Sequence, residues 1–423
     1  MKKINTFFVS FIIVILFIGC SQDSNKDLGY LEVENIEDIR KLNNLNYVDI
    51  EEIKSLADSI FTTTNIMFSK KGIKNQVREI SPIRTKENKS SIYIVNYENG
   101  GFFIMPADKR IFPILAYSND NNFDLNTKEI PPFLIEWLQN QNSYIADLQQ
   151  GKIKDSVDFS KHWNANFIEN YIAGVKQSKL TARGTYGNSP ELIYRNGPLT
   201  ITEWGQGEGY NNMAPNLNCL SQSNGRALTG CVATAMAQIM KFHNHPNSYN
   251  WSIMPNKKNG NSNTNSGGFN EISKLMRDAG NSVNMNYGCE NSGAITSHVA
   301  NALKSPFSYK SAIYTEHDIL SKIENEIKNG YPVILRGGEE FIFNGQSIYT
   351  GGHAWVCDGY QEVMIEICIK VGRWGYDCHD KIVPSYYMNF GWDGLWNGWY
   401  LSPFKGDYGT FDYKNGIIYN IRK

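Results

Sequence analysis

Apolar residues recur at helical spacing between Thr229 and His243, in the stretch T-G-C-V-A-T-A-M-A-Q-I-M-K-F-H. The positions at this spacing are Val232, Ala235, Met236, Ile239 and Met240. They predict a helix with one buried face. Cys231 falls in the first turn, where unpaired backbone N–H groups and the helix dipole favour a thiolate. The pattern therefore predicts a buried helix that begins at a reactive cysteine.

The remainder of the C-terminal part, residues 199–423, shows helical patterns first and strand patterns afterwards. Its other expected helices cover residues 269–279, 297–304 and 318–328. Its expected strands cover residues 332–335, 348–350, 353–358, 386–390 and 398–402. Helices followed by strands are typical of an α+β fold.

The N-terminal part, residues 30–180, forms a second unit. Its expected elements are a helix at residues 51–68, strands at 91–97 and 101–105, and a helix from 131 to 148. The turn Glu98-Asn99-Gly100 joins the two strands into a hairpin, and proline is tolerated in the first turn of the second helix. This unit contains His162 but no cysteine, so it is poor in nucleophiles and bases.

A polar, turn-rich linker at residues 181–198 separates the two units. It contains Arg183 and Arg195, which offer cutting points to a protease that recognises basic residues. We interpret it as an activation linker.

The first residues form an export signal. A basic start is followed by an apolar run from Phe7 to Ile18 and then by Gly19 and Cys20. This order is typical of a secretory signal peptide, and the cysteine makes it similar to a bacterial lipoprotein signal, with Phe17 as a mild departure. We expect residues 1–19 to be removed, Cys20 to be lipidated and residues 20–29 to form a tether. A plain signal peptide with an incidental cysteine is the alternative.

Composition excludes several classes of protein. The 423 residues have a net charge of −1, which gives no electrostatic case for nucleic acid. No stretch after the signal is long and apolar enough to span a bilayer. His243 and His245 form an H-N-H motif, but no further ligand cluster lies near them in the sequence, and no paired C-x-x-C knuckles occur. We expect no metal and no cofactor.

Six cysteines remain after Cys20, all of them in the C-terminal unit. An exported protein can oxidise some of them. Cys368 and Cys378 flank a short segment and are the most plausible pair, but the sequence leaves the pairing open. We read Cys219 and Cys357 as structural.

A histidine and an asparagine complete a candidate catalytic set. His353 lies in T-G-G-H-A-W-V-C-D-G-Y, where two glycines lead into a strand and permit close approach by a ligand. Asn389 lies in Y-Y-M-N-F-G-W-D-G, at a strand end. An asparagine oxygen can accept from one imidazole nitrogen and aim the other at a thiolate. The order Cys231, His353, Asn389 is the layout of papain-like cysteine peptidases.

Longer motifs make the resemblance specific. The segments G-C-V-A-T-A-M-A-Q-I-M-K-F-H-N-H-P, G-G-H-A-W-V-C-D-G and N-F-G-W-D-G-L-W-N-G-W resemble the streptopain family of bacterial cysteine peptidases. The similarity extends to N-M-N-Y-G around Asn286. In the N-terminal unit, N-G-G-F-F-I-M-P-A-D-K-R is similar to the inhibitory prosegment of that family. The resemblance implies a papain-like fold, with a helical part carrying the cysteine and an antiparallel sheet carrying His353 and Asn389, preceded by an α+β prodomain.

The resemblance also implies roles for individual residues. Cys231 matches the nucleophile, His353 the general base and Asn389 the residue that orients the base. Gln206, in E-W-G-Q-G-E-G-Y-N, matches the glutamine that forms an oxyanion hole with the backbone N–H of Cys231. The expected substrate-binding residues are Gly352, whose backbone pairs with the substrate, Trp392, which shields the histidine from water, and Ser292 and Gly293.

Three features depart from the family pattern. Phe390 replaces a tryptophan next to Asn389, and the Gly-rich stretch near the carboxyl end is shortened. An extra segment at residues 361–385 is rich in isoleucine, cysteine and aromatic residues. It is expected to form either an elaborated hairpin or a rim of the substrate cleft.

These patterns predict an exported cysteine endopeptidase made as a zymogen, either anchored in the cell envelope through lipid on Cys20 or released after processing. Its partners are protein or peptide substrates and its own prodomain, residues 30–180, as an intramolecular inhibitor. A cell-wall amidase with a Cys-His site and an inactive adhesin or inhibitor that retains the fold are the alternatives. The Gln206 motif and the N-terminal unit favour the peptidase.

Overall fold

The computed structural model of the chain describes residues 45–60, 76–127, 130–153, 157–174, 189–343, 346–371, 375–401 and 415–423. The expected signal peptide, Cys20 and the tether lie outside these residues. So do residues 181–188 of the linker and the end of the helix expected at residues 51–68. Residues 189–198 are described and differ from the expected turn-rich linker, because Glu191–Asn196 form a strand paired in the sheet. None of the described helices has the length and apolar character needed to cross a membrane.

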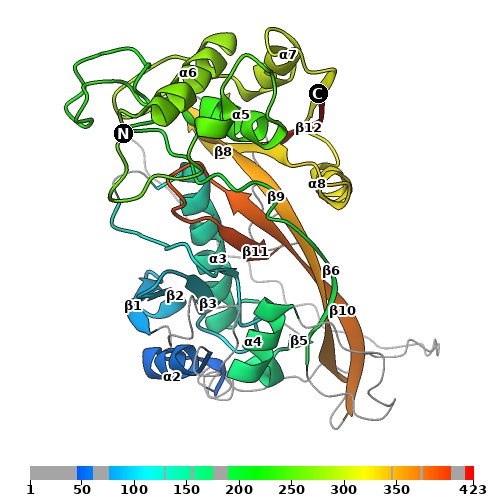
Figure 1. Cartoon of the computed structure of the whole chain (residues 1–423). Helices are drawn as coiled ribbons and strands as arrows, with labels where there is room; N and C mark the ends of the chain where they lie inside the picture. The colour runs from blue at the N-terminus through cyan, green and yellow to red at the C-terminus, as the bar shows by residue number, and fades with distance from the viewer. Residues whose placement is uncertain are drawn as a thin grey trace, which may run out of the picture.

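The N-terminal unit combines helices with a four-stranded antiparallel segment (Figure 1). Its elements are α2 (Ile50–Ile60), β1 (Val77–Arg84), β2 (Ser90–Tyr97), β3 (Phe102–Pro106), β4 (Ala116–Ser118), α3 (Pro132–Gln149), β5 (Val157–Asp158), η1 (Ser160–His162) and α4 (Ala165–Ala173). The predicted hairpin is confirmed as β2 and β3, and the turn between them contains Gly100 and Gly101 at positive φ. The helix expected after Pro131 is confirmed as α3, with proline in its first turn.

The C-terminal unit follows the predicted order of helices and then strands, except that two strands that were not predicted, β6 and β7, precede α5 and α8. Its elements are β6 (Glu191–Asn196), α5 (Cys231–His243), η2 (Trp251–Ile253), α6 (Gly267–Ser282), η3 (Thr296–His298), α7 (Val299–Lys304), β7 (Ser311–Thr315), α8 (Ile319–Lys328), β8 (Val333–Phe343), β9 (Gln346–Val371), β10 (Gly375–Asn389), β11 (Gly398–Leu401) and β12 (Gly416–Arg422). The strands expected at residues 348–350 and 353–358 are parts of the single long strand β9.

One sheet joins the two units. Its strand order is β1-β2-β3-β4-β11-β10-β9-β8-β12-β7, and β5 and β6 pair separately with β9. The units meet where β4 pairs with β11, through Tyr117 opposite Trp399 and Ala116 opposite Tyr400. The pairings between the named strands are antiparallel. The α+β prediction is therefore confirmed, but the two units share a sheet that local sequence patterns did not indicate.

The long strands β9 and β10 connect two ends of the molecule (Figure 1). At one end α5, α6 and α7 pack around a core that includes Ala354 and Val356 of β9. In the middle, α3 of the N-terminal unit packs on the sheet through Leu134 and Trp137. At the other end α4 and β5 lie beside the extensions of β9 and β10. The extra segment at residues 361–385 is thus a hairpin extension, which is one of the two expected forms.

Two disulfides occur among the described residues. Cys368 pairs with Cys378, the pair that the sequence favoured but left open, and Cys219 pairs with Cys289, a pairing that the sequence did not indicate. Cys231 and Cys357 are free. The cysteine at the start of α5 therefore keeps its thiol for chemistry.

Candidate active site

Cys231 begins helix α5, as the sequence predicts. Gly230 precedes it at φ 86°, and a Cβ there would lie 2.9 Å from the carbonyl oxygen of Ser292, so only glycine fits this turn. The backbone N–H of Ala354 donates to Cys231 Sγ at 3.4 Å. Burial raises the pKa of the thiol, and backbone N–H groups around the sulfur act in the opposite direction.

His353 lies on β9, next to the residue that contacts the thiol. Its Nε2 donates to the carbonyl oxygen of Phe390 at 3.0 Å. Because a carbonyl can only accept, this bond places the ring proton on Nε2 and leaves Nδ1 as a base. Burial lowers the pKa of His353 to about 4, against the effect of the Phe390 bond. The histidine is therefore neutral in this closed state.

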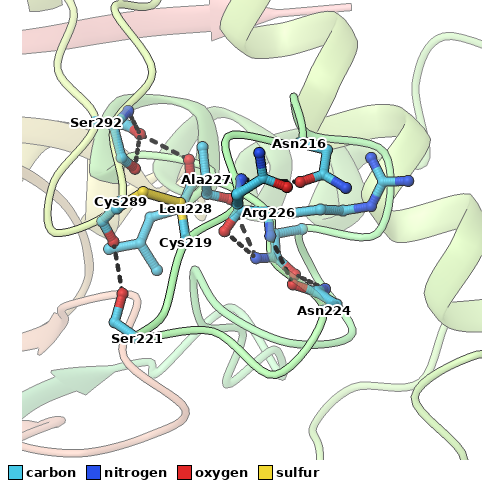
Figure 2. The surroundings of a disulfide bond; sticks show 12 residues. Asn216, Cys219, Ser221, Asn224, Arg226, Ala227, Leu228, Cys289 and Ser292 are labelled. Carbon is cyan, nitrogen blue, oxygen red and sulfur yellow. Dashed lines mark hydrogen bonds between the residues drawn. A yellow bond between two sulfur atoms is a disulfide. The ribbon is translucent and has the colours of Figure 1, made fainter.

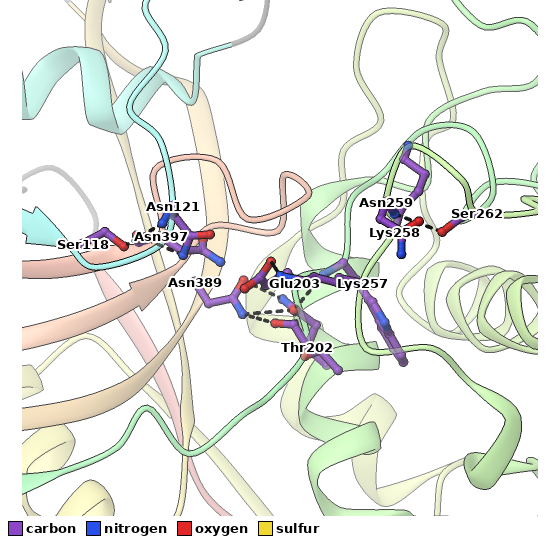
Figure 3. A network of polar contacts seen from close by, with 12 residues as sticks. Ser118, Asn121, Thr202, Glu203, Lys257, Lys258, Asn259, Ser262, Asn389 and Asn397 are labelled. Atoms are coloured by element: carbon purple, nitrogen blue, oxygen red, sulfur yellow. Dashed lines mark hydrogen bonds and ion pairs between the residues drawn. The ribbon is translucent and has the colours of Figure 1, made fainter. Parts of the chain in front are cut away.

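The side chain of Asn389 makes different hydrogen bonds from the one that its expected role requires. Its Nδ2 donates to the carbonyl of Thr202 at 2.7 Å and to Oε1 of Gln238 at 3.1 Å, while its Oδ1 accepts from Nε2 of Gln238 at 3.2 Å (Figure 3). The side chain is thus directed toward α5 rather than the imidazole, and the expected hydrogen bond from His353 goes to the backbone of the next residue. These bonds hold the turn that carries the Phe390 carbonyl.

Gln238 is a buried residue that sequence reasoning missed. Its Oε1 also accepts from Oγ1 of Thr202 at 2.9 Å and from the backbone N–H of Trp204 at 3.4 Å. It therefore ties α5, which carries Cys231, to the segment that leads to Gln206 and to the Asn389 turn. The available signal was a glutamine inside an otherwise apolar helical stripe.

Gln206 is also buried, and its position suits an oxyanion donor. Its carbonyl accepts from the backbone N–H of Thr229, two residues before the cysteine. Its Nε2 has no hydrogen-bond partner within the described part of the chain. Because an unpaired buried N–H is costly, this amide is ready to bind an oxygen in the adjoining cavity.

One cavity of about 360 Å³ brings the candidate residues together. From the C-terminal unit it is lined by Gln206, Leu228, Cys231, Glu290, Asn291, Ser292, Gly293, Gly352, His353 and Trp392. Its wall also includes Ile130 and Pro131 of the N-terminal unit, immediately before α3. All of the residues expected to bind substrate line this cavity. The contribution of Ile130 and Pro131 was not predicted.

A disulfide supports the loop that forms one wall (Figure 2). Cys289 is bonded to Cys219, and Ser292 Oγ donates to the carbonyl of Leu228 at 2.7 Å and accepts from the backbone N–H of Gly288 at 3.0 Å. The hydroxyl of Ser292 therefore holds the loop in place. Gly293 is exposed, and nothing lies within 4 Å of the position of a Cβ, so it leaves space beside the loop. Its backbone N–H and carbonyl are paired with those of Asn286.

The possible metal ligands have other partners. Nδ1 of His243 lies 3.2 Å from the hydroxyl of Tyr309, and Nε2 of His245 lies 3.3 Å from the carbonyl of Ser308. Across the described residues, the grouping with metal-ligand spacing is Glu366, Cys368 and Cys378, and both of its sulfur atoms are engaged in the disulfide.

Comparisons with known proteins define the class. Residues 204–400 match the Peptidase C10 family, and residues 46–145 match the Spi protease inhibitor family. The chain therefore contains a Spi-type inhibitor domain followed by a Peptidase C10 domain. It is a streptopain-like cysteine peptidase with an N-terminal prosegment.

Individual relatives agree with this assignment. Streptopain of Streptococcus pyogenes serotype M1 is 28% identical over 354 residues, which cover 74% of this chain and 73% of the relative. The thiol protease/hemagglutinin PrtT of Porphyromonas gingivalis is 25% identical over 333 residues, covering 71% of this chain but 32% of that protein. Prointerpain A of Prevotella intermedia shares the fold, with a TM-score of 0.52, 22% identity and coverage of 82% of this chain and 99% of that structure.

Proposed function

We propose that this chain is the exported zymogen of a cysteine endopeptidase, with Cys231 as nucleophile, His353 as base and Gln206 as oxyanion donor. The observation that carries the proposal is the shared cavity. All three residues line it, together with Ile130 and Pro131 of the prosegment. Prosegment residues in the wall of this cavity support a role for the prosegment in keeping substrate from the thiol.

The geometry supports acyl transfer through a thioester. The thiol proton passes from Cys231 Sγ to Nδ1 of His353, and the thiolate attacks the peptide carbonyl carbon. The backbone N–H of Cys231 and the amide N–H of Gln206 stabilise the oxyanion. As the C–N bond breaks, the imidazolium protonates the leaving amine. His353 then takes a proton from water, which hydrolyses the thioester.

Other residues, in and behind the cleft, position the reacting groups. Asn389 and Gln238 hold the turn whose Phe390 carbonyl orients His353. Gly352 presents backbone to the substrate, and Gly293 leaves room for it because nothing lies within 4 Å of a Cβ at that position. Ser292 fixes the loop before Gly293, and Trp392 covers the histidine side of the cavity.

Burial of the catalytic pair adds to latency. In the prosegment-bound state the pKa of Cys231 is raised and that of His353 is lowered to about 4, both mainly by desolvation. These shifts disfavour the ion pair of thiolate and imidazolium. Displacement of Ile130 and Pro131 admits water, which moves both pKa values toward the reactive ion pair.

Export rests on the N-terminal sequence. The basic start, the apolar run and Gly19-Cys20 support a lipoprotein signal that anchors the zymogen in the cell envelope through Cys20. Cleavage within residues 181–198 would then separate the peptidase from its anchor. A Cys20→Ala variant that still incorporates radiolabelled palmitate would contradict this assignment.

The test compares two free cysteines in one chain. Cys231→Ala should abolish azocasein hydrolysis and self-processing, whereas Cys357→Ala should retain both, because Cys357 lines no part of the cavity. Circular dichroism and the melting temperature should show that both variants are folded. Turnover by Cys231→Ala within tenfold of the parent would disprove the proposal.

A further inference from the structure

The extension of β9 and β10 beyond the catalytic region is not used by the proposed chemistry. We call residues 361–371 and 375–385 the arm. Its rungs run from Gln361 opposite Ser385 to Val371 opposite Gly375. No arm residue lines the cavity that contains Cys231. A segment of this length that carries no catalytic group requires another role.

One face of the arm is apolar and is covered by the prosegment. Val363, Ile365 and Ile367 alternate along β9 and are 1%, 2% and 3% exposed. They belong to the same hydrophobic cluster as Phe167, Ile168, Tyr171 and Ile172 of α4. The prosegment strand β5 also pairs with Ile369 and Cys368 at the far end of the arm. Removal of the prosegment would therefore expose a continuous apolar strip, which is unfavourable in water.

At the base of the arm, a cluster of buried polar side chains joins the arm to the prosegment. Gln361 Nε2 donates to the hydroxyl of Tyr117 at 3.2 Å and to Oγ of Ser385 at 3.2 Å. The hydroxyl of Tyr171 lies 3.0 Å from the same Ser385 oxygen. Arg195 donates to Gln361 Oε1 at 2.8 Å and to the carbonyl of Ile172 at 3.0 Å. Because Tyr117, Tyr171 and Ile172 belong to the prosegment, its departure would break bonds that fix the register of docking.

The Cys368–Cys378 disulfide lies at the far end of the arm, where the prosegment strand β5 pairs with β9. The two cysteines are opposite each other in the ladder of β9 and β10, and Cys368 is also the partner of Asp158 of β5. Lys161 Nζ lies 3.9 Å from Cys368 Sγ. Cys378 is exposed, so a soluble thiol can reach the bond. The disulfide thus crosslinks the two strands at the rung to which β5 binds.

We propose that the arm is a second docking surface for the prosegment, outside the cleft, and that the Cys368–Cys378 disulfide maintains it. The occupant is residues 157–174 of this chain, after the linker has been cut. Cutting alone then leaves the prosegment bound and the peptidase latent. A dithiol reductant weakens the binding of the prosegment to the arm. Two thiols form at Cys368 and Cys378, and the reductant is oxidised to its disulfide. The claim that the bound prosegment keeps the peptidase inactive rests on the proposed function. The claim that the prosegment binds the arm does not.

The test measures binding in a protein without the nucleophile. Full-length Cys231→Ala protein receives a recognition site for an external protease within residues 181–188 and is cut to completion. The two fragments should elute together on gel filtration at about micromolar concentration. The double variant Cys368→Ser/Cys378→Ser, cut in the same way, should release the prosegment at least about tenfold faster. Equal release rates, or complete separation of the parent fragments at once, would overturn the proposal.

Substitutions at two isoleucines distinguish a specific loss of the docking face from a general loss of structure. Ile365 is buried on the inner face of β9, whereas Ile382 on β10 is 51% exposed. Ile365→Asp should accelerate release, and Ile382→Asp should leave the release rate within about twofold. In the chain that retains Cys231, the processed peptidase with Cys368→Ser/Cys378→Ser should keep its kcat/KM on a short peptide. Loss of that activity would show that the arm supports the catalytic fold and would overturn a docking role. Because the binding assay needs no activity, its failure is distinguishable from failure of the proposed chemistry.

Discussion

The two halves of strand β9 pack against different parts of the protein. Around His353, the strand packs against α5 and the sheet of its own unit, with Ala354 and Val356 in the core that surrounds the nucleophile helix. Beyond Gln361, its buried residues pack against α4 of the prosegment. The face of the first half that carries Ala354 and Val356 stays covered by α5 whether or not the prosegment is bound. The opposite face, with Trp355 and Cys357, shares a cluster with Leu134 and Trp137 of α3, and the buried face of the second half depends on α4. One strand therefore carries a permanent catalytic surface and a surface whose cover can be removed.

This difference separates turnover from latency. Substitutions around the first half should change the rate of peptide hydrolysis, and substitutions in the arm should change how long the prosegment remains bound. The predictions below test that separation, in order of expected effect.

The largest effect is expected at the oxyanion donor. Gln206→Ala should lower kcat of the processed enzyme by roughly 10²–10³-fold, because a preorganised donor to the developing negative charge is lost. Its KM should change far less. Steady-state kinetics on a short fluorogenic peptide measures both constants. A kcat within threefold of the parent would exclude Gln206 from the oxyanion hole.

A smaller loss is expected at Gln238, which does not line the cavity that contains Cys231. Gln238→Leu should lower kcat by roughly 10- to 100-fold through misplacement of the Phe390 carbonyl and of His353. The pH dependence of Cys231 alkylation by iodoacetamide should also shift, because the imidazole that supports the thiolate is no longer fixed. Gln238→Glu retains the oxygen that accepts from Thr202 and Trp204 and should recover part of the activity. A changed melting temperature with an unchanged alkylation profile would indicate a purely structural role.

The sequence predicted the catalytic half much better than the arm. Cys231 and His353 lie in local patterns, an amphipathic helix and a glycine-led strand, and both patterns correspond to elements of the structure. The predicted Asn389–His353 bond was wrong because the acceptor is a backbone carbonyl, which any residue at position 390 would supply. The docking of β4 on β11 and of β5 on β9 joins residues far apart in the chain, and such pairing leaves no local signature.

Acid should weaken the arm interface through His162. This prosegment residue is buried, packs on Phe167 and has a pKa lowered mainly by desolvation. The backbone of Glu366 on the arm faces the imidazole, so separation from the arm hydrates the ring and lets its pKa rise toward the ordinary value of 6.5. Binding is at full strength above the free value and is lost as pH falls toward the bound value. The dissociation constant of the cut Cys231→Ala complex should rise between pH 7.5 and 5.

A matched pair of histidines checks the origin of this acid effect. His162→Gln should reduce the pH dependence of the dissociation constant, while His317→Gln, at an exposed position, should preserve it. Binding that is independent of pH in the parent complex would contradict the assignment to His162.

The smallest effect on turnover is expected at Cys357, which lies on β9 between the two halves. Its side chain is fully buried, and burial raises the pKa of its thiol well above the usual range, so it is a poor nucleophile in the folded protein. Cys357→Ala should cost about 1–2 kcal/mol of stability through a small cavity. It should leave kcat/KM and the release of the prosegment each within about twofold, because the thiol is a small part of the cluster that Cys357 shares with Leu134 and Trp137 of α3. Thermal denaturation, peptide kinetics and gel filtration of the cut complex measure the three quantities. A large loss in either function, without unfolding, would show that the two halves of β9 are coupled through this residue.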